Sequence, residues 1–203
     1  RDWIERIEEV GQMKIEKGQP GYLKALKTKY LSWALAEFAI VAAVFLLGYI
    51  QTKTKQNLFT IVAVVGCLPA AKMLVEYIIV YPHKGIEPEK YQEIEEKAPL
   101  VMRLYDMLIT STEKAMPIDA LVISGHVVCG YASSQRTDEA YIAKHIKSVL
   151  RDNQYEKMTV KIFHDYGMFL ARAEGLNNMA AVERPEDDRN ERNIQKILYS
   201  IAM

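Results

Sequence analysis

Two long apolar stretches constrain this chain more than any other feature of its sequence. "LSWALAEFAIVAAVFLLGYI", residues 31–50, holds twenty residues with one charge, and "LFTIVAVVGCLPAAKMLVEYIIV", residues 58–80, holds twenty-three with two. As helices rising 1.5 Å per residue, both are long enough to cross roughly 30 Å of hydrocarbon. Core helices of a soluble protein are the alternative, but helices of this length in soluble proteins usually carry a polar face. We therefore predict a transmembrane hairpin at residues 31–82, with spans at 31–50 and 58–80.

The basic residues beside these stretches set the expected orientation. Seven lysines lie on the two outer flanks, whereas the connector "QTKTKQN" holds only Lys53 and Lys55. Because cytoplasmic flanks carry the excess of Lys and Arg, we expect both termini in the cytoplasm. The chain is then a multi-pass protein of the cell membrane with two spans, and the lipid bilayer is its first partner. The seven lysines are Lys17, Lys24, Lys27, Lys29, Lys84, Lys90 and Lys97.

Three charged residues, Glu37, Lys72 and Glu76, lie inside the predicted spans, where a charge is costly. Each lies within about nine residues of an expected cytoplasmic helix end, so all three fall in the same leaflet. We expect a structural pair of Glu37 with Lys72 that holds the helices in register. The other interpretation is an ion path, which two spans enclose only in an oligomer. Small residues in both helices permit close contact within the hairpin or between copies, and a homo-oligomer is expected.

After the second stretch the pattern changes from continuously apolar to periodic. Residues 83–182 are predicted to form a cytoplasmic α/β domain with the order helix, strand, strand, strand, helix, strand, helix, which makes the chain an α+β membrane protein. "IDALVISGHVVCGYA" predicts a β-hairpin that turns at Gly125. Thr137 is the expected N-cap of the next helix, and Gly175 is expected to end the last helix of the domain.

Two charged segments flank these parts. Residues 1–30 are predicted to form an amphipathic cytoplasmic segment that precedes the hairpin. Residues 183–203 are predicted to form a charged linker followed by an amphipathic helix with apolar residues at helical spacing. That helix is expected to dock either on this domain or on a neighbouring copy.

The order helix, three strands, helix, strand resembles the core of the restriction-endonuclease-like fold. "IDALVISGHVVCGYASS", followed by a helix and "TVKIFHD", is similar to the nuclease-related domain family over roughly residues 90–170. The resemblance implies that Asp119 is the metal-binding acid of the second strand. The acid-x-Lys half of the family's motif would fall on Tyr131, Ala132 and Ser133, which supply neither a carboxylate nor an ammonium group. Because such nucleases hold their divalent ion with clustered carboxylates, a degenerate domain is expected.

A small anion site is the remaining candidate in this domain. Ser133, Ser134, Arg136 and Thr137 precede a predicted helix N-terminus, a place where anions bind readily. Residues 84–203 carry sixteen Lys or Arg against nineteen Asp or Glu, a net charge of −3, which gives no basic excess for nucleic acid. The expected ligand is therefore a small anion or a protein partner.

Histidine and cysteine give weaker signals. His126, His145 and His164 lack the short spacing of a metal site, so surface or hydrogen-bonded roles are expected for them. Cys67 falls in a predicted span and Cys129 in a predicted strand, so neither is placed for a disulfide.

These observations predict a membrane-anchored, non-catalytic binding or scaffold protein that carries a degenerate nuclease-like domain. One alternative is a membrane-tethered nuclease in which Asp119 binds Mg²⁺ or Mn²⁺ with help from Asp106, Glu113 or Asp138. A cofactor is expected only in that case. The other alternative is a small oligomeric channel gated by ligand binding to the cytoplasmic domain.

Overall fold

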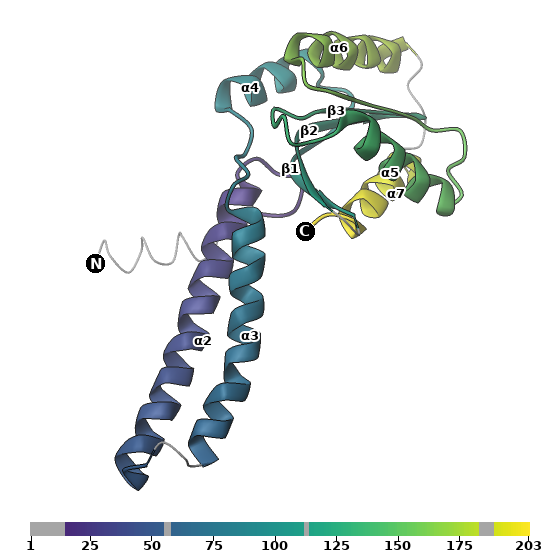
Figure 1. Ribbon diagram of the computed structural model, residues 1–203. Coiled ribbons are helices and arrows are strands. Elements are labelled where there is room, and N and C mark those ends of the chain that lie inside the picture. The colour runs from purple at the N-terminus through teal and green to yellow at the C-terminus, as the bar shows by residue number, and fades with distance from the viewer. Residues whose placement is uncertain (1–14, 55–57, 112–113, 183–188) are drawn as a thin grey trace. The chain divides into compact units, whose positions relative to one another are not determined.

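The computed structural model describes residues 15–54, 58–111, 114–182 and 189–203 of the 203-residue chain (Figure 1). The chain divides into two compact units. One is a helical hairpin, Lys24–Pro82, and the other contains the described residues up to Leu23 together with His83–Met203. We call these the hairpin unit and the sheet unit. Residues 1–14 of the predicted amphipathic segment and residues 183–188 of the predicted linker lie outside the described residues.

The hairpin unit consists of helix α2 (Tyr22–Thr52) and helix α3 (Leu58–Val80), which run side by side (Figure 1). Both are long and apolar enough to cross a membrane. α3 matches the predicted span, whereas α2 begins nine residues earlier than predicted. The added turns, "YLKALKTKY", are rich in Leu, Ala and Lys, which have high helix propensity but do not extend an apolar stretch.

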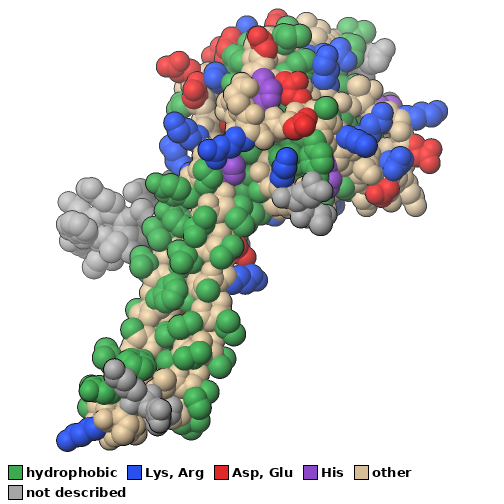
Figure 2. Space-filling model, viewed as in Figure 1, with side chains coloured by type: hydrophobic (Ala, Val, Ile, Leu, Met, Phe, Trp, Pro, Cys, Tyr) green, Lys and Arg blue, Asp and Glu red, His purple; other side chains and the backbone are tan. Residues whose placement is uncertain are grey.

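The outer surface of the hairpin unit is apolar (Figure 2). Of the 26 large hydrophobic side chains that are exposed in the described residues, 22 belong to the hairpin unit and four to the sheet unit. Small side chains lie between the helices, where Ala34, Ala63 and Ala70 are buried. A Cβ atom on Gly66 would lie 3.0 Å from Cγ2 of Val41, so glycine permits this close approach. The surface suits hydrocarbon better than water.

The sheet unit contains a four-stranded mixed sheet between two layers of helices (Figure 1). The strands, in their order across the sheet, are β1 (Met102–Thr110), β2 (Ala115–Ser124), β3 (Val127–Tyr131) and β4 (Thr159–Phe163). β1, β2 and β3 are antiparallel neighbours, whereas β4 pairs parallel to β3. The helices are α4 (Pro88–Lys97), α5 (Glu139–Asp152), α6 (Tyr166–Val182) and α7 (Arg189–Ser200).

Along the chain these elements follow the order helix, three strands, helix, strand, helix, helix. The predicted turn at Gly125 is present, because β2 and β3 pair antiparallel on either side of it and Gly125 has a φ of +53°. The α+β class is therefore confirmed. The assignment to the restriction-endonuclease-like fold stays a prediction.

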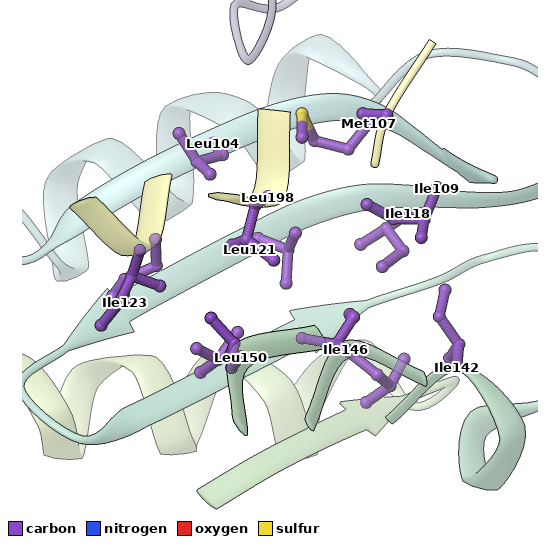
Figure 3. Packing of buried hydrophobic residues seen from close by; sticks show 14 of the residues in the cluster. Leu104, Met107, Ile109, Ile118, Leu121, Ile123, Ile142, Ile146, Leu150 and Leu198 are labelled. Carbon is purple, nitrogen blue, oxygen red and sulfur yellow. The ribbon is translucent and has the colours of Figure 1, made fainter. Parts of the chain in front are cut away.

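A hydrophobic cluster fills each face of the sheet. α5 and α7 cover one face, where Ile142, Ile146 and Leu150 follow at intervals of four residues and α7 adds Leu198 (Figure 3). α4 and α6 cover the other face with a second cluster that includes Phe169. The C-terminal helix thus docks on its own domain, which is the first of the two arrangements expected for it.

Residues on both sides of the hairpin also pair with β1, the edge strand of the sheet. The Tyr105 amide donates to the Gly18 carbonyl at 2.8 Å, and the Met203 amide donates to the Leu108 carbonyl at 3.0 Å. These contacts cover backbone groups that an edge strand would otherwise expose. Residues 15–23 therefore belong with the sheet unit, although the sequence grouped them with a separate segment.

Two predicted helix ends are wrong. α6 continues through Gly175 to Val182, because Leu176 and Asn177 beyond the glycine are buried against the sheet unit. The N-cap of α5 is Asp138, one residue after the expected Thr137.

Candidate functional site

Asp119, the expected metal-binding acid, lies on β2 with only 5 % of its surface exposed. Its Oδ2 atom accepts a hydrogen bond from the Ser133 amide at 2.5 Å. Ser133 follows the end of β3, so the carboxylate fastens the segment after β3 to the neighbouring strand. A buried carboxylate needs such a donor. This contact gives Asp119 a structural role within the fold.

The position expected to carry the second acid holds an aromatic cluster. The Tyr131 ring lies against the Tyr166 ring, with centroids 5.3 Å apart, and against the Phe169 ring, with centroids 5.9 Å apart. From α4, the Lys90 ammonium donates to the Tyr131 hydroxyl at 3.1 Å and lies 5.2 Å from the centroid of its ring. Glu87 pairs with the same ammonium at 3.0 Å. A lysine is thus present near this position, but its ammonium group is bound by Tyr131 and by Glu87, the N-cap residue of α4.

These contacts act on the ionisation of the groups involved. Burial opposes the charged form of Lys90, but the hydrogen bonds to Tyr131 and Glu87 outweigh it and raise the pKa of Lys90. Burial, followed by the hydrogen bond that the Tyr166 hydroxyl donates to Glu93, raises the pKa of Tyr166. At neutral pH Lys90 is therefore charged and Tyr166 is neutral.

Asp106 is fully buried on β1. Its Oδ2 atom accepts from the Gly21 amide at 2.6 Å, and its Oδ1 atom accepts from the Ile86 amide at 2.7 Å. The nuclease alternative expected this residue to bind the metal ion together with Asp119. In the structure both of its oxygens accept hydrogen bonds from backbone amides, which gives the carboxylate a connecting role.

The segment before α5 is organised by capping. Oδ1 of Asp138 accepts hydrogen bonds from the amides of Ala140 and Tyr141, both at 3.0 Å. Thr137 is 1 % exposed, and its hydroxyl donates to the Pro117 carbonyl at 3.1 Å, so its side chain turns away from the helix. The amides that a bound anion would use already bind a carboxylate.

The other residues of the predicted anion site add little to it. The Ser133 amide is engaged by Asp119, and the Ser134 hydroxyl accepts a hydrogen bond from the Arg136 amide at 3.4 Å. These contacts are those of a compact turn.

His126, His145 and His164 lie apart, on the β2–β3 turn, on α5 and after β4. Nδ1 of His164 lies 2.6 Å from the Ala132 carbonyl, whereas Nε2 of His145 is buried without a hydrogen-bond partner among the described residues. Within the described ranges, no three His, Cys, Asp or Glu side chains gather closely enough to hold a metal ion. Glu113, the third proposed helper for Asp119, lies outside those ranges.

In the hairpin unit, the ion pair that the structure shows lies within α3. Nζ of Lys72 is 3.9 Å from Oε1 of Glu76, four residues along the helix, and the Lys72 side chain is 72 % exposed. Oε2 of Glu37 is buried and has no hydrogen-bond partner in the described part of the chain. The expected contact between Glu37 and Lys72 stays a prediction.

The sheet unit has cavities that the sequence does not predict, and one of them lies beside α6. It has a volume of about 270 Å³ and is lined by Val127, Cys129, Thr159, Lys161, Phe163 and Arg172. The lining comes from β3, β4 and α6. The signal that could have found it is the alternation Thr159, Lys161, Phe163, which places a lysine on the same strand face as a buried aromatic ring.

Comparison with known proteins adds no family to these observations. No model of a protein family matches the chain, and neither a curated protein nor a solved structure matches it.

Proposed function

We propose that this chain is a membrane-anchored, non-catalytic binding or scaffold protein. In this proposal the hairpin unit spans the cell membrane twice, and the sheet unit is a degenerate nuclease-like domain in the cytoplasm. The observation that carries the proposal is the distribution of exposed apolar side chains. The hairpin unit holds 22 of the 26 in the described residues, and the sheet unit buries two hydrophobic clusters of its own. One unit suits lipid and the other suits water.

The non-catalytic part of the proposal rests on how the motif positions are used. Asp119 accepts the Ser133 amide, and Tyr131 holds the Lys90 ammonium within an aromatic cluster. In a nuclease these positions would bring carboxylates around a divalent ion. Here each of them stabilises the packing of neighbouring elements.

The cytoplasmic placement rests on the charge of the flanks. Lysines are concentrated at Lys17 and in the first turns of α2 and again after α3, whereas the connector between the helices has two. The positive-inside rule then favours a cytoplasmic sheet unit. Two free cysteines, Cys67 and Cys129, agree with a reducing compartment. The small residues between α2 and α3 pack the hairpin closely, and assembly of several copies in the membrane is part of the same proposal.

A labelling experiment tests the anchoring. In a Cys67→Ala, Cys129→Ala background, single cysteines are placed in the connector (Thr54→Cys) and in the exposed loop after α5 (Glu156→Cys). A membrane-impermeant maleimide should label Thr54→Cys in intact cells and Glu156→Cys only after lysis, and alkaline carbonate should leave both proteins in the membrane. Release of the chain by carbonate, or labelling of Glu156→Cys in intact cells, would contradict the proposal.

A further inference from the structure

The parallel pairing of β3 with β4 aligns side chains on the face of the sheet that α6 covers. The register pairs Cys129 with Lys161 and Tyr131 with Phe163. Cys129, Tyr131 and Phe163 all belong to the cluster beneath α4 and α6. Lys161 therefore lies on that same face, because side chains two residues apart on a strand share a face.

α6 covers only part of this face. Phe163 is buried at the end of β4 near the helix, whereas Thr159 and Lys161 are exposed. The cavity of about 270 Å³ lies at the uncovered part, and Arg172 reaches its lining from α6. It is a hollow between an edge strand and a helix, open at a rim that carries two cations.

Among the described residues, the two cations lack acidic partners. Neither Lys161 nor Arg172 forms an ion pair with any of the described residues, whereas Lys90 pairs with Glu87 in the same unit. Nζ of Lys161 lies 4.8 Å from the centroid of the Phe163 ring, a cation–π contact that holds the ammonium beside the cavity. This local positive charge stands out in a part of the chain whose net charge is −3.

The floor of the cavity is neutral and apolar. Cys129 is fully buried there. Burial raises the pKa of its thiol to about 12, while the positive charges of Arg172 and Lys161 act in the opposite direction, so both cations lie close to the thiol. Val127 and Phe163 add apolar surface, and the Thr159 hydroxyl adds a hydrogen-bond donor.

We propose that this cavity binds a small organic anion, of which a phosphate monoester with a compact apolar group is the fitting class. Lys161 and Arg172 bind the anionic group at the rim, and the apolar group packs on Val127, Cys129 and Phe163. Arg and Lys form strong charge-assisted hydrogen bonds with phosphate. The volume lies just below the roughly 300 Å³ at which pockets for drug-sized ligands begin, so the ligand is small.

This inference deepens the proposed function, because it names a ligand class for the binding domain and rests on that role. It differs in place from the site expected at residues 133–137, where Asp138 already occupies the helix amides. Lys161 lies on β4 and Arg172 lies eleven residues later on α6. Both reach one cavity because α6 packs beside β4.

The test is calorimetric titration of phenyl phosphate into the full chain in a non-ionic detergent. Wild type should bind, and the Lys161→Ala and Arg172→Ala variants should each weaken the affinity about tenfold, because each removes one charge-assisted contact. Lys144→Ala is the matched control, since Lys144 is an exposed cation on α5, at the opposite face of the sheet. It should bind like wild type. Inorganic phosphate should bind more weakly than phenyl phosphate, because it lacks the apolar group.

Two results would overturn the inference: no binding of phenyl phosphate by wild type at millimolar concentration, or equal affinity in wild type and in the Lys161→Ala, Arg172→Ala double variant. Both cations are exposed, so the variants should keep the wild-type thermal unfolding temperature. Carbonate extraction of the double variant reports on anchoring separately. A loss of phosphate binding with retained anchoring, or the reverse, therefore shows which proposal has failed.

A second arm distinguishes a soluble ligand from a lipid headgroup, which offers the same phosphate chemistry. Phenyl phosphate is titrated into the chain in nanodiscs of phosphatidylcholine alone and in nanodiscs that also contain phosphatidylglycerol. A soluble ligand predicts equal affinity in both. If phosphatidylglycerol weakens the binding of phenyl phosphate to wild type and does not change the residual binding to the double variant, the cavity binds an anionic headgroup.

Discussion

Asp106 and Gly21 are joined by a hydrogen bond of 2.6 Å, although 85 residues separate them in the sequence. Gly21 directly precedes α2, and Ile86, the second donor to the same carboxylate at 2.7 Å, follows α3. One buried side chain of the sheet unit therefore fastens the chain segments on both sides of the hairpin. Asp106 has a φ of +53°, which Asp tolerates better than most residues.

Replacing Asp106 should loosen both segments. Asp106→Ala leaves two buried amides without an acceptor and should lower the free energy of unfolding by about 3 kcal/mol. Asp106→Asn keeps one carbonyl oxygen as an acceptor, so it should lower the free energy of unfolding by less. Pulse proteolysis in urea measures the stability, and hydrogen exchange should show lost protection in residues 15–23 and 83–87 with none lost in α5. Unchanged exchange in Asp106→Ala would contradict the connecting role.

Gly85 should be required beside this carboxylate. A Cβ atom there would lie 2.6 Å from Oδ2 of Asp106, which is fully buried and held by two amides. Gly85→Ala should therefore destabilise the sheet unit by about 2 kcal/mol. Gly175→Ala is the matched control, since its Cβ meets no atom within 4 Å and it lies inside α6, so it should stabilise by up to about 1 kcal/mol. Equal unfolding midpoints for the two variants would refute this packing.

The sequence predicted some of these features and not others, for physical reasons. An apolar stretch such as residues 58–80 and a turn such as that at Gly125 are encoded locally, so pattern and spacing predict them. The choice of Asp138 over Thr137 as the N-cap depends on the Pro117 carbonyl, twenty residues away, to which the Thr137 hydroxyl donates.

The sites depend even more on tertiary contacts. The hydrogen bond between Asp106 and Gly21 spans the whole hairpin, and Lys161 and Arg172 line one cavity only because α6 packs beside β4. Neither pair leaves a periodic signal in the sequence.

Alkaline pH should destabilise the sheet unit through Tyr105. Burial, followed by the hydrogen bond that its hydroxyl donates to Oε1 of Glu95 at 2.7 Å, raises the pKa of Tyr105. The phenol stays neutral in the folded state at pH values where it ionises in the unfolded chain. The stabilisation that the neutral Tyr105 side chain gives to the folded state is therefore fully present below about pH 10. It is lost as the pH rises further, at up to about 1.4 kcal/mol per pH unit. Tyr105→Phe should flatten the fall in stability between pH 9 and 11, and an unchanged slope would count against this assignment.

Asp119 should behave as a structural acceptor. Asp119→Asn retains an oxygen for the Ser133 amide and should cost less than about 1 kcal/mol, whereas Asp119→Ala leaves that amide unpaired and should cost about 2 kcal/mol. The same urea experiment measures both. Equal destabilisation by the two variants would show that the hydrogen bond is not what Asp119 contributes.

A DNA cleavage assay tests most directly whether the anchored domain is a nuclease. The full chain in detergent is incubated with supercoiled plasmid and Mg²⁺ or Mn²⁺, beside Asp119→Ala prepared in the same way. We expect wild type to nick the plasmid no faster than the variant. Metal-dependent nicking by wild type that disappears in Asp119→Ala would contradict it and would make Asp119 a catalytic residue.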